Sequence, residues 1–186
     1  MPQPTAAERK KVRDTLLAHV SQEHCDAEIG GDGYDPSANN ILVWQHDGKR
    51  DYLALWWASA DYYTNKKADG SPETICSGGS ATSSFYLAHL VRRDNRLHIA
   101  EQDMLAKQLA NTDVNNPYAV HPRFIESIRL NPDNTLNIIS AKPAYRHEGD
   151  MEGMNFPSKQ WRYRVRLPDM EVLEARYTGK TSYAKE

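Results

Sequence analysis

The chain has 186 residues, a formal net charge of −2 from 23 Lys and Arg against 25 Asp and Glu, and 39% hydrophobic residues. This length suits a single domain over residues 1–186, large enough to form a core without a metal or a disulfide framework. The charge balance argues against nucleic acid or an anionic membrane surface as partner. The chain contains no run of about 18 apolar residues, so no membrane-spanning helix is predicted.

The first predicted element is an amphipathic helix over about residues 6–21. Thr5 and Glu8 have the spacing of a capping box, in which each side chain bonds the backbone amide of the other residue. The apolar residues of one helix face follow at four-residue spacing: Val12, Leu16 and Val20. No apolar leader segment precedes this helix, which favours a cytoplasmic chain or a mature form of an exported one.

Four hairpins are predicted after the helix, at about residues 41–59, 85–101, 124–141 and 160–177. Each consists of two runs with strand-like composition around a polar turn, and the Asp-Gly pair of the first is a strong hairpin signal. The expected fold is therefore α+β: an N-terminal helix packed on a twisted antiparallel meander of about eight strands. The alternative is a partly closed β-barrel.

The last hairpin has the clearest alternation of apolar and polar residues. Its first strand places four apolar residues on the expected core face: Trp161, Tyr163, Val165 and Leu167. Arg162, Arg164 and Arg166 alternate with them and form a basic stripe on the other face. Arg162 and Arg164 are candidates for contact with an acidic partner, although pairing with glutamates of the adjoining strand is the simpler explanation of the stripe.

The two cysteines, Cys25 and Cys76, are 51 positions apart and belong to no CxxC motif. We expect them to form a disulfide, since neither has a second metal ligand beside it. The alternative is that Cys76, in the segment Cys-Ser-Gly-Gly-Ser, is a nucleophile with a histidine such as His121 as its base. No local catalytic signature surrounds Cys76, so no catalytic residue is assigned.

The seven histidines are scattered and show no HExxH spacing. His89 and His98 are on opposite arms of one predicted hairpin, where they would form at most a weak two-ligand metal site. A separate hydrogen-bonded role for each histidine is the preferred interpretation. No metal and no cofactor are therefore expected.

The strongest functional hint is a group of aromatic residues near the end of the second predicted strand. Trp57, Tyr62 and Tyr63 are at or beyond this strand end, and the long polar segment 60–84 is predicted to be a loop. Aromatic rings with polar tips are typical of interfaces and ligand mouths. These three residues are the predicted partner-binding site.

The function predicted from these features is a non-catalytic protein-binding module. An inhibitor or a toxin-neutralising immunity protein, acting on a secreted toxin or enzyme, would need such loops and no catalytic pair. If Cys25 and Cys76 are bridged, we expect a periplasmic or secreted location, and otherwise a cytoplasmic one. The alternatives are a small hydrolase-type enzyme that uses Cys76 with a histidine, and a carrier of a small ligand.

Overall fold

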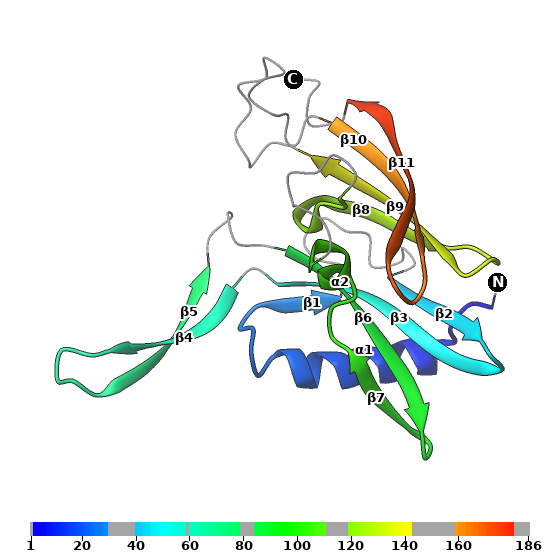
Figure 1. Ribbon diagram of the computed structural model, residues 1–186. Helices are drawn as coiled ribbons and strands as arrows, with labels where there is room; N and C mark the ends of the chain where they lie inside the picture. Colours follow the sequence, from blue (N-terminus) through cyan, green and yellow to red (C-terminus); the bar gives the residue numbers. More distant parts are fainter. Residues whose placement is uncertain are drawn as a thin grey trace.

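The computed structural model describes residues 2–29, 40–58, 60–78, 84–110, 119–142 and 159–180, with backbone only at residues 60–64, 76–78 and 109–110. Two α-helices, a 3-10 turn and eleven strands make up the described chain (Figure 1). In chain order they are α1 (Ala6–Val20), β1 (Ala27–Ile29), β2 (Ile41–His46), β3 (Lys49–Ala58), β4 (Ala60–Lys66), β5 (Pro72–Gly78), β6 (Ser84–Arg93), β7 (Arg96–Glu101), α2 (Leu105–Ala110), η1 (Pro122–Phe124), β8 (Ile125–Leu130), β9 (Thr135–Lys142), β10 (Lys159–Arg166) and β11 (Glu171–Lys180). The predicted α+β class is confirmed.

Helix α1 begins as the sequence predicts. The Thr5 hydroxyl accepts a hydrogen bond from the Glu8 amide at 3.2 Å, and the Glu8 carboxylate accepts one from the Thr5 amide at 2.8 Å. The capping box therefore satisfies two amides that the helix leaves without intrahelical partners. The predicted apolar face is completely buried: Val12, Leu16 and Val20.

The strands form three antiparallel sheets instead of one meander or a closed barrel. Strands β1, β2, β3, β6 and β7 form a five-stranded sheet, and β8 to β11 form a four-stranded sheet in chain order. Strand β3 is at the centre of the first sheet. It pairs with β6 along one edge and with β2 and then β1 along the other. The third sheet is the hairpin of β4 and β5.

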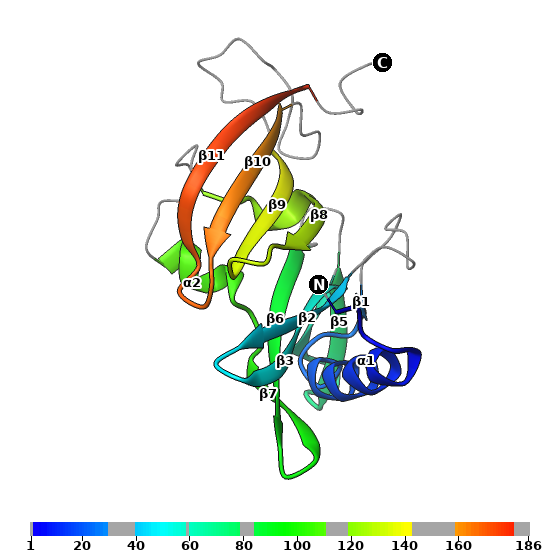
Figure 2. The same cartoon turned by 90° about the vertical axis from the view of Figure 1, so that its right-hand side faces the viewer.

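Two separate cores lie on the two faces of the five-stranded sheet. Helix α1 covers one face, where Leu16 packs with Tyr52 and Trp56 of β3. On the other face, Leu53 and Leu55 pack against residues of the four-stranded sheet. The chain is thus layered as helix, five-stranded sheet and four-stranded sheet, as the two views of the ribbon show (Figures 1 and 2).

The composition of β3 explains why the expected single meander divides into two sheets. Six consecutive residues of this strand, 51–56, are buried, so both faces of the strand need cover. One helix can cover only one face, and the hairpins β8–β9 and β10–β11 supply the second layer. The apolar sides of β9 and β10, with Leu136, Ile138, Tyr163 and Val165, pack on that second face.

The segment 60–84, which the sequence predicts to be a loop, contains a fifth hairpin. Strands β4 and β5 pair from Ala60 opposite Gly78 to Lys66 opposite Pro72. This hairpin extends away from the two larger sheets (Figure 1). The loop prediction is therefore wrong here, because aromatic and β-branched residues such as Tyr63, Thr74 and Ile75 favour strand structure despite the polar composition.

The four hairpins predicted from the sequence match the described strands within a few residues. The short helix α2 lies between β7 and η1. No helix within the described ranges is long and apolar enough to cross a membrane.

Candidate metal-binding site

The hairpin of β2 and β3 brings His46 and Asp51 to the same face of the sheet. Asp47 and Gly48 form its two-residue turn with positive φ angles of 48° and 71°, as a type I′ turn requires. This turn pairs Trp44 with Asp51 and His46 with Lys49. Since side chains alternate along a strand, Trp44, His46 and Asp51 share the face that looks toward the four-stranded sheet.

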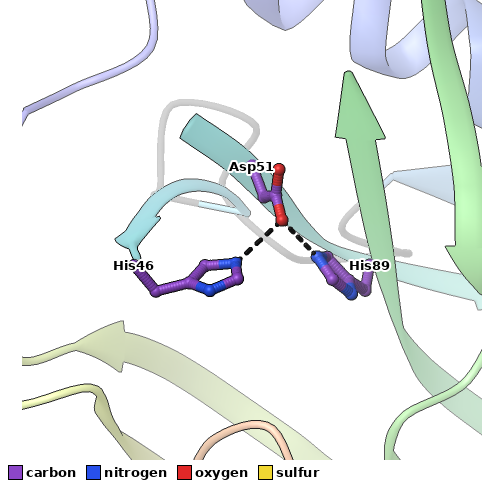
Figure 3. A group of neighbouring side chains, drawn as sticks. All are labelled: His46, Asp51 and His89. Atoms are coloured by element: carbon purple, nitrogen blue, oxygen red, sulfur yellow. Dashed lines mark hydrogen bonds and ion pairs between the residues drawn. The ribbon is translucent and has the colours of Figure 1, made fainter. Parts of the chain in front are cut away.

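Pairing of β3 with β6 adds His89 to this group. His89 is opposite Leu53, two positions along β3 from Asp51 and on the same face. Figure 3 shows both imidazole rings directed at one carboxylate oxygen. Nε2 of His46 lies 2.8 Å from Oδ2 of Asp51, and Nε2 of His89 lies 3.0 Å from the same atom.

The cluster of His46, Asp51 and His89 is deeply placed. The side chain of Asp51 is only 5% exposed, and those of His46 and His89 are 20% and 15% exposed. Burying a carboxylate is costly unless hydrogen bonds or opposite charge replace its water. Here the imidazole nitrogens of His46 and His89 take the place of water beside the Asp51 carboxylate. Imidazole nitrogen is also the commonest protein ligand of transition metals.

Trp44 holds the two imidazoles in place. Its ring stacks on that of His46, with centroids 3.8 Å apart and an interplanar angle of 24°, and its centroid is 5.0 Å from that of His89. The indole Nε1 donates a hydrogen bond to Oδ1 of Asn134 at 3.1 Å. Because Asn134 belongs to the turn between β8 and β9, this bond anchors Trp44, which flanks the cluster, to the four-stranded sheet.

A pocket of about 580 Å³ opens onto the cluster. His46, Asp51 and His89 line it together with four cationic residues, Lys49, Arg50, Arg92 and Arg93. Asp51 is the only carboxylate among the described residues of this lining, and the exposed Asp47 carboxylate approaches Nδ1 of His46 at 3.8 Å. The pocket therefore combines two imidazoles and a buried carboxylate with a strongly positive rim.

The three side chains are compatible with one tetrahedral metal ion. Their nearest nitrogen and oxygen atoms all lie within 4.8 Å of one another. Ligand atoms at about 2.0–2.1 Å from a zinc ion are roughly 3.3 Å apart in tetrahedral geometry. The nitrogen–oxygen distances to Asp51, 2.8 Å from His46 and 3.0 Å from His89, are slightly shorter, so small side-chain rotations would admit the ion. On binding, each Nε2 would present its lone pair to the metal instead of a hydrogen to Asp51.

The sequence did not single out this cluster. His89 and His98 are on opposite arms of their hairpin, but the structure pairs His89 with Glu101 and His98 with Val91, so the expectation that these two histidines could face each other is wrong. The Asp-Gly turn was a usable signal for His46 and Asp51, since a two-residue turn fixes which residues share a face. Nothing local to His89 indicated its partners.

His121, considered as a base for Cys76, has a structural role in η1. Its Nδ1 accepts a hydrogen bond from the Arg123 amide at 3.3 Å. Burial, reinforced by the positive charges of Lys142 and Arg123, lowers the pKa of His121 to about 4. The side chain of Cys76 lies outside the described residues.

The predicted aromatic site is only partly described. Trp56 and Trp57 face opposite sides of β3, and Trp57 is half-buried against the core between the two large sheets. Tyr62 and Tyr63 belong to β4 and pair with Cys76 and Ile75. Their side chains are outside the described part of the chain, so a role in partner binding stays a prediction.

The predicted basic stripe is exposed, as its alternation indicated. Arg162, Arg164 and Arg166 are exposed while Tyr163 and Val165 are buried. Arg164 pairs with Asp133, in the turn before β9, and Arg166 pairs with Asp169 and Glu171. Carboxylates thus neutralise part of the stripe, and contact of Arg162 and Arg164 with a partner remains a prediction.

The disulfide between Cys25 and Cys76 also stays a prediction. The described residues include no free cysteine, but the Cys76 side chain is not among them. Cys25 follows the end of α1, and Cys76 lies on β5.

No protein-family model matches the chain, and no significant match was found among curated proteins or solved structures. The geometry of the pocket is therefore the basis for a functional proposal.

Proposed function

We propose that this protein binds a divalent transition-metal ion of the zinc type through His46, Asp51 and His89. One observation carries the proposal: Nε2 atoms from two strands converge on a single oxygen of a carboxylate that is only 5% exposed. Two imidazoles and one carboxylate are a ligand set suited to Zn²⁺, Co²⁺ and related ions.

The surroundings support a site that would keep an open coordination position. Three protein ligands with a fourth position for water or substrate characterise catalytic zinc sites, whereas structural sites usually have four protein ligands. The fourth position would face the pocket of about 580 Å³. Trp44 would orient both histidine ligands, since it contacts their rings on the side of the second sheet.

The test is titration of the metal-free protein with Co²⁺ and Zn²⁺, followed by visible absorption and calorimetry. One equivalent should bind to the wild type. His46→Ala, Asp51→Asn and His89→Ala should each weaken binding at least about tenfold, which is about 1.4 kcal/mol. His98→Ala is the matched control, because His98 is exposed on β7 of the same sheet and should leave binding unchanged.

Two results would contradict the proposal. The first is a wild type that takes up no metal, and the second is equal affinity in the wild type and Asp51→Asn. In either case the cluster would be a hydrogen-bond network that serves stability. Thermal unfolding of the same variants shows whether lost metal binding results from lost structure. A variant that is folded but does not bind metal supports a ligand role for the changed residue.

A second candidate function is recognition of another protein, as an inhibitor or immunity protein of the periplasm would require. The hairpin of β4 and β5 favours it, because its described strands pair only with each other and it extends from the rest of the fold (Figure 1). Such a hairpin offers strand edges to a partner. Trp57, Tyr62 and Tyr63 would supply the aromatic contacts.

This candidate is tested with a double variant, Tyr62→Ala with Tyr63→Ala, against a defined secreted toxin or enzyme. Capture of that partner should fall while the melting temperature is unchanged. Lys66→Ala, an exposed change on the same strand, is the control. Capture that survives the double variant would remove the tyrosines from the interface.

A further inference from the structure

The positive rim of the pocket is not explained by the metal ligands. Strand alternation places Lys49, two residues before Asp51 on β3, on the face that carries the cluster. Arg93, four residues after His89 on β6, is on that face too. Both side chains are exposed and line the pocket. Cations next to a metal site would repel the metal itself, so their presence calls for an anionic ligand.

These two cations have no carboxylate partner among the described residues. The ion pairs of the described chain involve neither Lys49 nor Arg93. Arg50, which lines the same pocket, differs because two hydrogen bonds tie it to Glu8. Among the described residues, Lys49, Arg92 and Arg93 therefore remain without a carboxylate partner at the pocket, whereas the charge of Arg50 is neutralised; of these three, Lys49 and Arg93 are on the face of the cluster.

We propose that the pocket binds a phosphate-type oxyanion, placed between the open coordination position of the metal and the side chains of Lys49 and Arg93. This inference rests on the proposed metal site and names the ligand class of that site. An arginine guanidinium binds two oxygens of a phosphate at once, and a lysine ammonium adds a point charge. A third oxygen would coordinate the metal.

The size and polarity of the pocket support an oxyanion on a small organic group. A pocket of about 580 Å³ exceeds the volume of inorganic phosphate and lies within the range of small-molecule sites. Val91 and Ala100 supply its apolar lining next to the charged groups. A phosphomonoester, with one charged end and one organic end, therefore suits the site better than the free ion.

The experiment uses Co²⁺-loaded protein from which unbound metal has been removed. Inorganic phosphate and phenyl phosphate are titrated separately while the visible spectrum of Co²⁺ is followed, with acetate as a carboxylate control. We expect both phosphates to change the spectrum at saturable concentrations, and phenyl phosphate to bind at least about threefold more tightly. Arg93→Gln and Lys49→Gln should each weaken phosphate binding at least about tenfold and should not weaken Co²⁺ binding, since each removes a positive charge near the metal.

The control variant is Arg162→Gln, which removes one exposed arginine from β10 without touching the pocket lining. It should bind both phosphates like the wild type. If Co²⁺ binds but phosphate leaves its spectrum unchanged, the oxyanion inference is wrong and the metal site stands. Equal phosphate affinity in Arg93→Gln, Lys49→Gln and wild type would also overturn it. A protein that binds no Co²⁺ would contradict the metal proposal first.

Discussion

Glu8, in the first turn of α1, holds Arg50 of β3 through two hydrogen bonds. Nε of Arg50 donates to Oε1 at 3.0 Å, and its second terminal nitrogen donates to Oε2 at 3.1 Å. The hydroxyl of Tyr52 donates to the same carboxylate at 2.7 Å. One residue thus caps the helix, attaches it to the central strand and neutralises a cation beside the pocket.

The first prediction concerns Glu8→Gln and acid stability. Hydrogen bonds from Arg50, Tyr52 and Thr5 lower the pKa of Glu8 from 4.5 to about 2. The folded state therefore favours the carboxylate, and this stabilisation is complete above the unfolded pKa and is lost as pH falls from about 4.5 to about 2. We expect Glu8→Gln to lower the free energy of unfolding at pH 7 by about 1–2 kcal/mol, since the pair is partly exposed.

Urea denaturation between pH 2 and pH 7 measures this effect. The wild type should lose more stability on acidification than Glu8→Gln, and the two curves should converge near pH 2. Glu28→Gln, an exposed change on β1, is the control and should follow the wild type. Parallel curves for Glu8→Gln and the wild type would show that Glu8 contributes no pH-dependent stability.

The second prediction concerns Asp103, whose contribution to stability changes with pH in the opposite direction to that of Glu8. Its Oδ1 accepts hydrogen bonds from the amides of Leu105 at 2.9 Å and Leu87 at 3.3 Å, which connects the start of α2 to β6. Burial outweighs these bonds and raises the pKa of Asp103 to about 6. The folded state therefore binds the proton more tightly, so this group makes stability fall as pH rises from about 4 to about 6.

Two substitutions separate the charge of Asp103 from its role as hydrogen-bond acceptor for the two amides. Asp103→Asn keeps an oxygen acceptor and removes the charge, so it should flatten the loss of stability between pH 4 and pH 6, a term of roughly 2 kcal/mol. Asp103→Ala removes the acceptor as well and should cost about 1 kcal/mol at pH 4 relative to Asn. Unfolding curves of the wild type and both variants at pH 4, 5, 6 and 7 test these two expectations. An Asn variant with the wild-type slope would contradict the assignment.

The third prediction uses Trp44 as a reporter of the metal site. Because its ring stacks on His46, a paramagnetic ion bound to His46 should quench its fluorescence. Trp44→Phe should abolish most of the Co²⁺-dependent quenching and keep Co²⁺ affinity within about threefold. Trp161→Phe is the control, since that ring stacks against Tyr163 instead. Full quenching in Trp44→Phe would place the bound ion elsewhere.

The fourth prediction concerns the cysteines. If Cys25 and Cys76 form a disulfide, thiol titration of the denatured, unreduced protein should find no free thiol, and reduction should raise the intact mass by about two units. Cys25→Ser should then lower stability by about 2–4 kcal/mol, since the closed loop is long. Two titratable thiols would remove the support for an exported protein and make Cys76 a nucleophile worth testing.

Local patterns in the sequence determined the helix and the four hairpins. The Thr5–Glu8 capping box and the four-residue apolar spacing depend only on neighbouring residues, and the Asp47–Gly48 turn fixes its own register. The alternation around Tyr163 likewise predicted which side chains are buried. These features are local because helix caps, turns and strand faces are set by residues a few positions apart.

Tertiary structure decided how the hairpins combine and where the site forms. The burial of β3 on both faces made two sheets of the expected one, and only the pairing of β3 with β6 brought His89 to Asp51, 38 residues away. Strand pairing between distant segments depends on the packing of whole faces, which no short pattern encodes. The local sequence therefore places His46 and Asp51 near each other across a turn. Packing around β3 adds His89 and completes the three-residue site.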